Sequence, residues 1–279
     1  MTQEPMAHPQ IFDHDTLHLR RSRRRADAMF LHEIARDEIK DRLSMVNRVF
    51  TKPAIVAAFA EPWVGVLPNA RIVSDKTVLD LEPQSHDLVI HSMALHWAND
   101  PVGQLIQCRR ALVEDGLLLV MTLGGQTLQE LRASLAEAET YISGGLSPRV
   151  APMAEIRDLG GLLQRAGFAL PVADLVPLTA QYRNLTHLMH DLRAMGETNA
   201  IKNRLRKFSR RALFELADHI YSQNYASDSG TLNATFELVC LTGWAPADSQ
   251  PQPLRPGSAK MRLADALRVP ESDLPNEEM

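Results

Sequence analysis

The chain has 279 residues, of which 45% are apolar, 23% charged and 5% aromatic, a composition typical of a soluble globular protein. Its 30 basic and 34 acidic residues leave a net charge of −4, which argues against a dedicated nucleic-acid-binding protein. A chain of this length buries roughly three quarters of its unfolded surface, so it folds without needing disulfides or a structural metal. The only two cysteines, Cys108 and Cys240, lie in separate apolar runs, which predicts two buried thiols in a reducing compartment.

The N-terminal region is basic rather than apolar. It lacks the apolar core of a secretory signal, and no stretch of the sequence approaches the roughly 18 apolar residues of a membrane helix. We therefore expect a cytoplasmic protein without an integral membrane segment. Residues 1–15 are expected to form a loose arm. The basic run from Arg20 to Arg25 predicts a solvated helix face, with contact to an acidic partner as the less favoured alternative.

Helices and strands then alternate along the chain. Apolar residues at the 3.6-residue period predict a helix from Asp27 to Val49. Continuous apolar runs predict buried strands of a parallel sheet, at residues 54–59, 70–75, 86–93 and 116–125. Amphipathic segments predict further helices, at residues 102–112, 126–142, 154–166, 184–195 and 209–224.

Two extended segments complete the predicted core. Residues 168–182 contain two prolines, which suit an edge strand or a bend. Residues 231–244 alternate with period 2, which predicts an antiparallel strand added late at an edge. We expect three regions: residues 1–52 as an N-terminal arm and helix, 53–245 as the α/β domain with a helical insert at about 184–224, and 246–279 as a flexible C-terminal tail.

The most specific pattern lies between His86 and Arg132. A strand ending in S-x-x-L-x-W-x-x-D is followed by a helix and a strand that begins D-G-x-L, with Ser92, Leu95, Trp97, Asp100, Asp115, Gly116 and Leu118 at the named positions. This segment resembles the class I S-adenosylmethionine-dependent methyltransferases. It is most similar to the biotin-pathway malonyl-carrier methyltransferases and to the mitochondrial respiratory complex I assembly factors on the same fold. Further blocks resemble the assembly-factor group, at residues 144–152, 157–174, 189–200 and 235–246.

The resemblance implies an α/β fold with a mostly parallel, seven-stranded Rossmann-like methyltransferase sheet, and S-adenosylmethionine as the cofactor. In that family a D-x-G-x-G turn follows the first strand and approaches the cofactor. Here the first strand is followed by AEPWVGVLPN, which has the single glycine Gly65, and only ten residues separate Phe59 from Ala70. A βαβ unit needs about 30 residues. The first unit is therefore predicted to be cut down to one strand and a turn, which puts cofactor binding in question.

Four residues are candidates for the cofactor site. Asp75 matches the family position beside the adenine, although an ordinary turn aspartate is equally compatible. Ser92, His96 and Trp97 lie at or just after the end of a strand, where open α/β sheets hold ligands. The alternatives are that Trp97 packs beneath a helix and that His96 caps a helix or faces solvent. Catalytic residues are not assigned.

No metal site is expected. His86 and His91 are five positions apart on one strand and so face opposite sides of the sheet. Arg149 and Arg193 lie in the assembly-factor blocks, where an arginine would clamp a carboxylate or a protein partner or form a surface ion pair. Two functions remain open: a methyltransferase-type protein with reduced or lost cofactor binding, or a non-catalytic or arginine-hydroxylating assembly factor. The second implies a protein substrate or partner from the respiratory chain.

Overall fold

The computed structural model describes residues 10–251, 257–258 and 261–268. The chain divides into two units, residues 1–246 and 247–279. In the described part of the second unit, the short helix α8 spans Leu263–Leu267. The boundaries after residues 52 and 245 that we expected from the sequence stay predictions. Everything that follows concerns the first unit.

A single mixed sheet organises this unit. Its strands are β1 (Pro53–Ala57), β2 (Arg71–Val73), β3 (His86–Ser92), β4 (Leu112–Leu123), β5 (Ala169–Tyr182) and β6 (Leu232–Trp244). They are arranged in the order β2-β1-β3-β4-β6-β5. The first four strands run parallel, whereas β6 is antiparallel to both β4 and β5. The α/β class and the mostly parallel methyltransferase-like sheet are therefore as predicted.

Side chains of the central strands are buried on both faces. On one face Ile55 and Ile90 join a cluster that includes residues of α2, α4, α6 and α7, and on the other Val56 and Val89 pack with residues of α3 and α5. Alternate residues of a strand point to opposite faces, so a continuous apolar run is what a strand covered on both sides requires. This is why the central strands were recognisable from the sequence.

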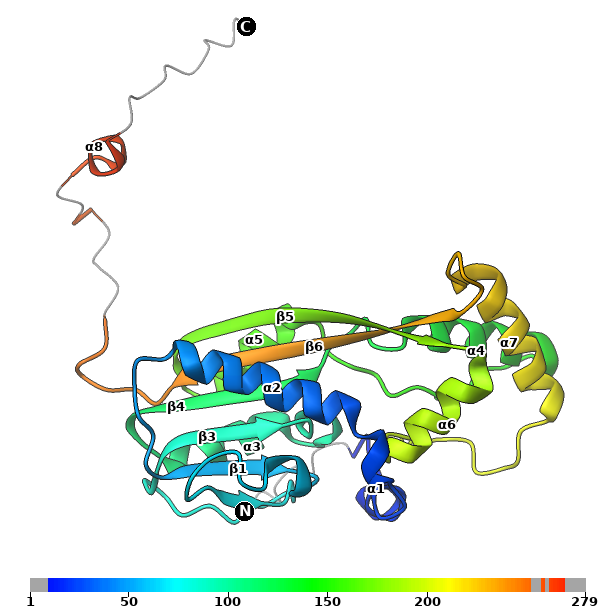
Figure 1. The fold of residues 1–279 in the computed structure, drawn as a ribbon, viewed down its shortest axis with the longest axis horizontal. Helices are drawn as coiled ribbons and strands as arrows, with labels where there is room; N and C mark the ends of the chain where they lie inside the picture. The colour runs from blue at the N-terminus through cyan, green and yellow to red at the C-terminus, as the bar shows by residue number, and fades with distance from the viewer. Residues whose placement is uncertain (1–9, 252–256, 259–260, 269–279) are drawn as a thin grey trace, which may run out of the picture. The chain divides into compact units, whose positions relative to one another are not determined.

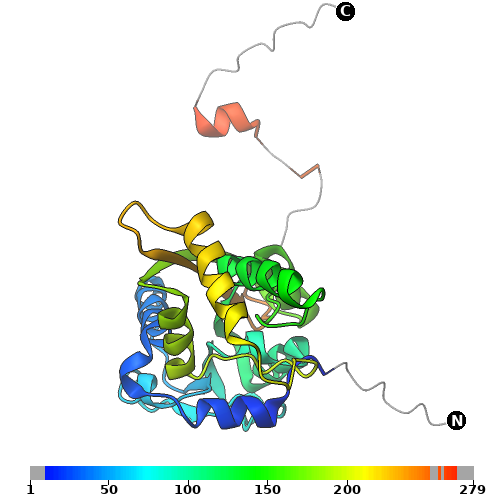
Figure 2. The same ribbon diagram turned by 90° about the vertical axis from the view of Figure 1, so that its right-hand side faces the viewer.

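The helices cover the two faces unequally. They are α1 (His14–Arg21), α2 (Phe30–Met45), α3 (Pro101–Ala111), α4 (Gln129–Ser143), α5 (Ile156–Arg165), α6 (Leu185–Met195) and α7 (Arg211–Tyr225), with 3-10 helices η1 (Ala26–Ala28), η2 (Glu61–Trp63) and η3 (Leu95–Trp97). Helix α2 lies across one face of the sheet (Figure 1), and α4, α6 and α7 gather near the ends of β5 and β6 (Figures 1 and 2). No helix in the described residues is long and apolar enough to cross a membrane.

The described residues form six strands, which corrects the predicted seven. Strands β1 and β2 are joined by residues 58–70, whose only helical element is the 3-10 helix η2. From the start of β1 to the end of β2 the chain has 21 residues, fewer than the roughly 30 of a βαβ unit, so the connection holds a turn and no full helix or further strand. The first βαβ unit is thus shortened, as the missing glycine turn predicted.

The position of β6 also differs from expectation. Its period-2 pattern correctly indicated an antiparallel strand, but β6 lies between β4 and β5, and β5 forms the edge. The C-terminal half of β6 is largely buried, as a strand with neighbours on both sides must be. Local periodicity reports which faces are covered and carries no information on which strands pair.

Of the arm predicted at residues 1–15, residues 1–9 lie outside the described residues, and residues 10–15 are less loose than predicted. Residues 14–21 form α1, and Asp13 caps it by accepting a hydrogen bond from the Thr16 amide. Phe12 is buried, exchanges hydrogen bonds with Asn99 and stacks edge-on against Trp97 with ring centroids 5.1 Å apart. The arm is therefore docked on the loop that follows β3.

Candidate functional site

The strand order places a topological switch point between β1 and β3. The chain leaves β1 toward β2 on one side and later returns to β3 on the other. In open α/β sheets, ligands bind in the crevice outside the carboxyl ends of the two strands at such a point. Here those ends are Ala57 and Ser92, which pair with each other in register. This crevice is where a nucleotide-type cofactor is expected.

Side chains of the protein itself occupy the region just beyond β1. Phe59 is buried, and the Arg24 guanidinium lies over its ring, with the Arg24 Cζ atom 4.3 Å from the ring centroid. The His32 ring packs edge-on against the same phenyl ring at 5.0 Å. An arginine over an aromatic face is an attractive arrangement, so these contacts hold the N-terminal segment and α2 against the end of β1.

Asp75, the first candidate residue, forms an ion pair. The Arg21 Nη1 atom donates to Asp75 Oδ2 at 2.7 Å, and the two side chains are 9% and 15% exposed. Arg21 comes from α1, so the basic run that we expected to be a solvated face contributes one buried arginine. The carboxylate that the family resemblance places beside the adenine thus has a cation of its own chain as partner.

A second buried carboxylate, Glu197, contacts two of the other candidate residues, His96 and Trp97. Trp97 Nε1 donates to its Oε2 at 2.6 Å, and the Nε2 atoms of His96 and His32 lie 3.5 and 3.8 Å from its oxygens. Burial alone would raise the pKa of Glu197, but these histidines and the Arg21 charge hold the pKa well below its ordinary value. Glu197 is therefore a buried anion at neutral pH.

The predicted site residues thus do not form one cluster in the structure. His96 and Trp97 meet at Glu197, whereas Asp75 meets Arg21. His96 is buried rather than exposed, with Nδ1 3.3 Å from the Thr122 hydroxyl. Ser92 is buried, and its hydroxyl has no hydrogen-bond partner among the described residues. The structure does not test whether any of the four binds a cofactor, so that assignment stays a prediction.

The motif residues around them have structural roles. Asp100 accepts a hydrogen bond from the Gly103 amide at 2.8 Å and caps α3, with Pro101 in the first turn, as helix starts prefer. Met93 follows β3 with a φ of +49°. A non-glycine residue in this region is uncommon and concentrates at functional sites. The backbone directly after β3 is therefore the strained part of the crevice.

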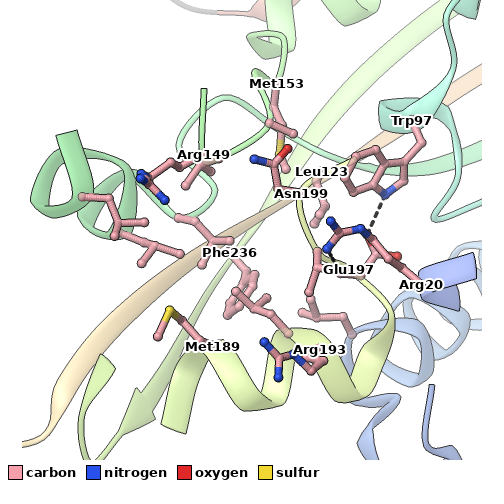
Figure 3. Close-up of a pocket in the computed structure, with 18 of the residues that line it drawn as sticks. Arg20, Trp97, Leu123, Arg149, Met153, Met189, Arg193, Glu197, Asn199 and Phe236 are labelled. Atoms are coloured by element: carbon pink, nitrogen blue, oxygen red, sulfur yellow. Dashed lines mark hydrogen bonds between the residues drawn. The ribbon is translucent and has the colours of Figure 1, made fainter. Parts of the chain in front are cut away.

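A cavity of about 240 Å³ lies beside Trp97 and Glu197. Its apolar wall includes Leu123, Leu128, Leu131, Met189, Phe214 and Phe236. Arg20, Arg149 and Arg193 also line it and come from α1, from the loop after α4 and from α6 (Figure 3). Arg149 has a carboxylate partner, since its Nη2 atom donates to Glu139 Oε1 at 2.7 Å. The two arginines singled out from the sequence therefore share one cavity.

Sequence reasoning missed Arg21 and Glu197. Glu197 lies in the block 189–200 that resembles the assembly factors, so its position was in view. Its burial depends on Trp97, which is 100 positions away. Arg21 lies in a run of five arginines and one serine, and nothing local distinguishes the one that is buried. Among the described residues no cluster of three or more His, Cys, Asp or Glu side chains is placed to hold a metal ion.

The crevice does not fit S-adenosylmethionine in the manner of the family. In the family a glycine turn lets the backbone approach the cofactor, and the position that Asp75 matches lies beside the adenine. Beyond β1 the chain has Phe59 packed beneath Arg24 instead, and the carboxylate of Asp75 is bound by Arg21.

The sheet order and the shortened first unit define an α/β protein of methyltransferase type. At the sheet edge where the family binds its cofactor, Phe59 packs beneath Arg24 and Asp75 pairs with Arg21. No protein-family model matches the chain. It is 34% identical over 236 residues to the protein named arginine-hydroxylase NDUFAF5, mitochondrial, of Danio rerio, covering 84% of this chain and 73% of that protein. The chain therefore belongs to the NDUFAF5 family.

The chain is also similar to two other proteins. The chain is 35% identical over 180 residues to a malonyl-[acyl-carrier protein] O-methyltransferase of Laribacter hongkongensis, covering 64% of this chain and 57% of that protein. A solved structure of a SAM-dependent methyltransferase from Archaeoglobus fulgidus aligns with a TM-score of 0.40 at 10% identity, over 76% of this chain and 94% of that one. The chain spans less than two thirds of several other NDUFAF5 proteins.

Proposed function

We propose that this chain is an assembly factor for respiratory complex I that keeps a methyltransferase-type fold and works on a protein partner without S-adenosylmethionine. The observation that carries the proposal is the occupied crevice at the switch point, where Arg21 holds Asp75. Membership of the NDUFAF5 family supports the choice of partner. The proposed site of action in the cell is the cytoplasmic side of the complex, where its soluble subunits are accessible.

The cofactor part of this proposal is tested by isothermal titration of the full chain with S-adenosylmethionine and S-adenosylhomocysteine. A malonyl-carrier methyltransferase titrated in the same buffer serves as the positive control. We expect no binding to this chain at millimolar ligand, because a ligand at Asp75 must first displace a buried guanidinium. Micromolar binding that is lost in Asp75→Ala would overturn the proposal.

The partner part is tested in cells of the native organism. Deleting the gene is expected to lower the amount of assembled complex I in membranes, and the wild-type chain is expected to restore it. NADH oxidation by isolated membranes gives the readout, and succinate oxidation in the same membranes is the control for general respiratory damage. Unchanged NADH oxidation after deletion contradicts an assembly role.

Arginine hydroxylation of the partner is the second candidate. The name of the relatives, arginine-hydroxylase, favours it. Mass spectrometry of complex I subunits from wild-type and deletion cells discriminates the two. An arginine that carries one added oxygen only when the chain is present supports hydroxylation, whereas unmodified arginines in both strains support a non-catalytic role.

A further inference from the structure

The cavity beside Trp97 has no role in the functions proposed above for the ends of β1 and β3. Its volume of about 240 Å³ equals roughly eight water molecules at their share of liquid volume. Small-molecule sites combine such apolar walls with a few polar groups that fix orientation. The wall residues Leu131 and Phe236 are buried core residues, so the cavity is held open by the packed elements around it.

The cations at this cavity are incompletely neutralised. Arg149 is paired with Glu139, but among the described residues the Arg20 guanidinium donates to the neutral Thr198 hydroxyl alone, at 2.7 Å. The Arg193 side chain is exposed and has no carboxylate partner in the part of the chain that the structure describes. Burial and then the charges of Arg204, Arg193 and Arg23 lower the pKa of Arg20, and the charge of the Asp13 carboxylate raises it in part.

The nearby carboxylate does not supply the missing negative charge. Glu197 is bound by Trp97 and flanked by His32 and His96, and neither Arg20 nor Arg193 forms an ion pair with it among the described residues. The partly buried Arg20 guanidinium gains from an anion beside it, and the exposed Arg193 lines the same cavity, where it can donate to that anion as well. Figure 3 shows Arg20 and Arg193 on the side of the cavity next to Glu197, with Phe236 between them and Arg149.

We propose that this cavity binds a small amphipathic carboxylate, with its apolar body against the leucine, methionine and phenylalanine wall and its carboxylate at Arg20 and Arg193. Guanidinium groups bind carboxylates through charge-assisted and often bidentate hydrogen bonds. Neither Asp75 nor Phe59, which lie at the crevice at the ends of β1 and β3, lines this cavity, although Trp97 and Glu197 do. The proposal does not depend on whether the chain acts in complex I assembly.

Titration calorimetry of the full chain with three ligands of one chain length tests the charge of the occupant. The probes are octanoate, octan-1-ol and octylguanidinium, which share an apolar body and carry a negative, neutral and positive head. We expect octanoate to bind more tightly than octanol, and octylguanidinium to bind most weakly. Equal affinity for octanoate and octanol overturns the role of the arginines, and tightest binding of octylguanidinium overturns the proposal outright.

Variants locate the binding. Arg193→Met is expected to weaken octanoate binding roughly tenfold, the effect of losing one hydrogen bond to a charged group, while leaving octanol binding unchanged. The matched control is Arg211→Met, because Arg211 is exposed on the neighbouring helix and pairs with Glu215. Met189→Trp fills the cavity and is expected to abolish binding of both ligands without changing the melting temperature greatly. Octanoate binding that survives Met189→Trp, or falls equally in both arginine variants, overturns the assignment.

Discussion

Arg21 connects three parts of the molecule through one side chain. It lies on α1, donates to Asp75 after β2, and contributes positive charge to the buried Glu197 after α6. A buried ion pair gives little net stability, but removing one partner leaves an uncompensated charge in the interior. The residue therefore fixes where the N-terminal helix docks rather than supplying much folding free energy itself.

Single and double variants of this pair give a direct prediction. Arg21→Met or Asp75→Leu alone is expected to lower the free energy of unfolding by about 3–5 kcal/mol, because each leaves a buried charge without its partner. The double variant is expected to cost less than either single one. Urea unfolding of all four proteins measures the coupling energy. Additive losses would show that the two side chains do not meet in solution.

For single residues, the sequence predicted where a side chain lies in the fold but not which distant side chain it pairs with. The end of the strand RIVSD correctly identified Asp75 as a residue at the sheet edge. Its partner, Arg21, lies 54 positions earlier, in a run of six residues of which five are arginines. Long-range ion pairs leave no local periodicity, so Arg21 was assigned to a solvated face with the rest of the run.

Helix α6 ends against α1 at Gly196. Gly196 ends α6 with a φ of +82°, a conformation that glycine adopts without penalty. A Cβ atom there would lie 3.0 Å from the Arg21 Cα atom. Gly196 therefore both terminates the helix and admits the backbone of α1, and the chain turns directly into Glu197.

Replacing this glycine tests the contact between the two helices. Gly196→Ala is expected to cost the strain of a left-handed alanine, about 1–2 kcal/mol, plus about 1–3 kcal/mol for pushing α1 away. Gly144→Ala is the matched control, because Gly144 ends α4 with a φ of +69° and has open space around its Cβ position. Equal losses in urea unfolding for the two variants would contradict close packing of α1 on α6.

Elements were predictable wherever burial followed a simple period. The strands around Ile55, Ile90 and Leu119 are apolar on both faces, and this composition marked them as central. Helix α1 has only Leu17 and Arg21 buried, which is too few positions to produce an amphipathic pattern. The neighbour order of β6 depends on pairing with β4, more than 100 positions earlier, which no window of local sequence contains.

Several buried groups differ in protonation between the folded and the unfolded chain, and His91 and Glu197 are two of them. Burial lowers the pKa of His91 below its ordinary 6.5, so below that pH the unfolded state takes up a proton that the folded state resists. Gln104 hydrogen-bonds its ring, and Asp75 and His96 are the charged or titratable groups that act on it. Glu197 has a pKa well below 4.5, so its contribution is present above pH 4.5 and is lost on further acidification.

Stability is therefore expected to decline in two separate windows as the pH falls. Below about pH 6.5 the His91 contribution declines by at most about 1.4 kcal/mol per pH unit, and below pH 4.5 the Glu197 contribution adds to the loss. Urea unfolding between pH 8 and pH 3 measures both. His91→Gln is expected to flatten the upper window and leave the lower one, and Glu197→Gln is expected to do the reverse. If the free energy of unfolding of the wild-type chain stays constant from pH 7 to pH 5, His91 accepts a proton in the folded state. The polar network around Arg21 and Glu197 would then have to rearrange to accommodate the charged imidazole.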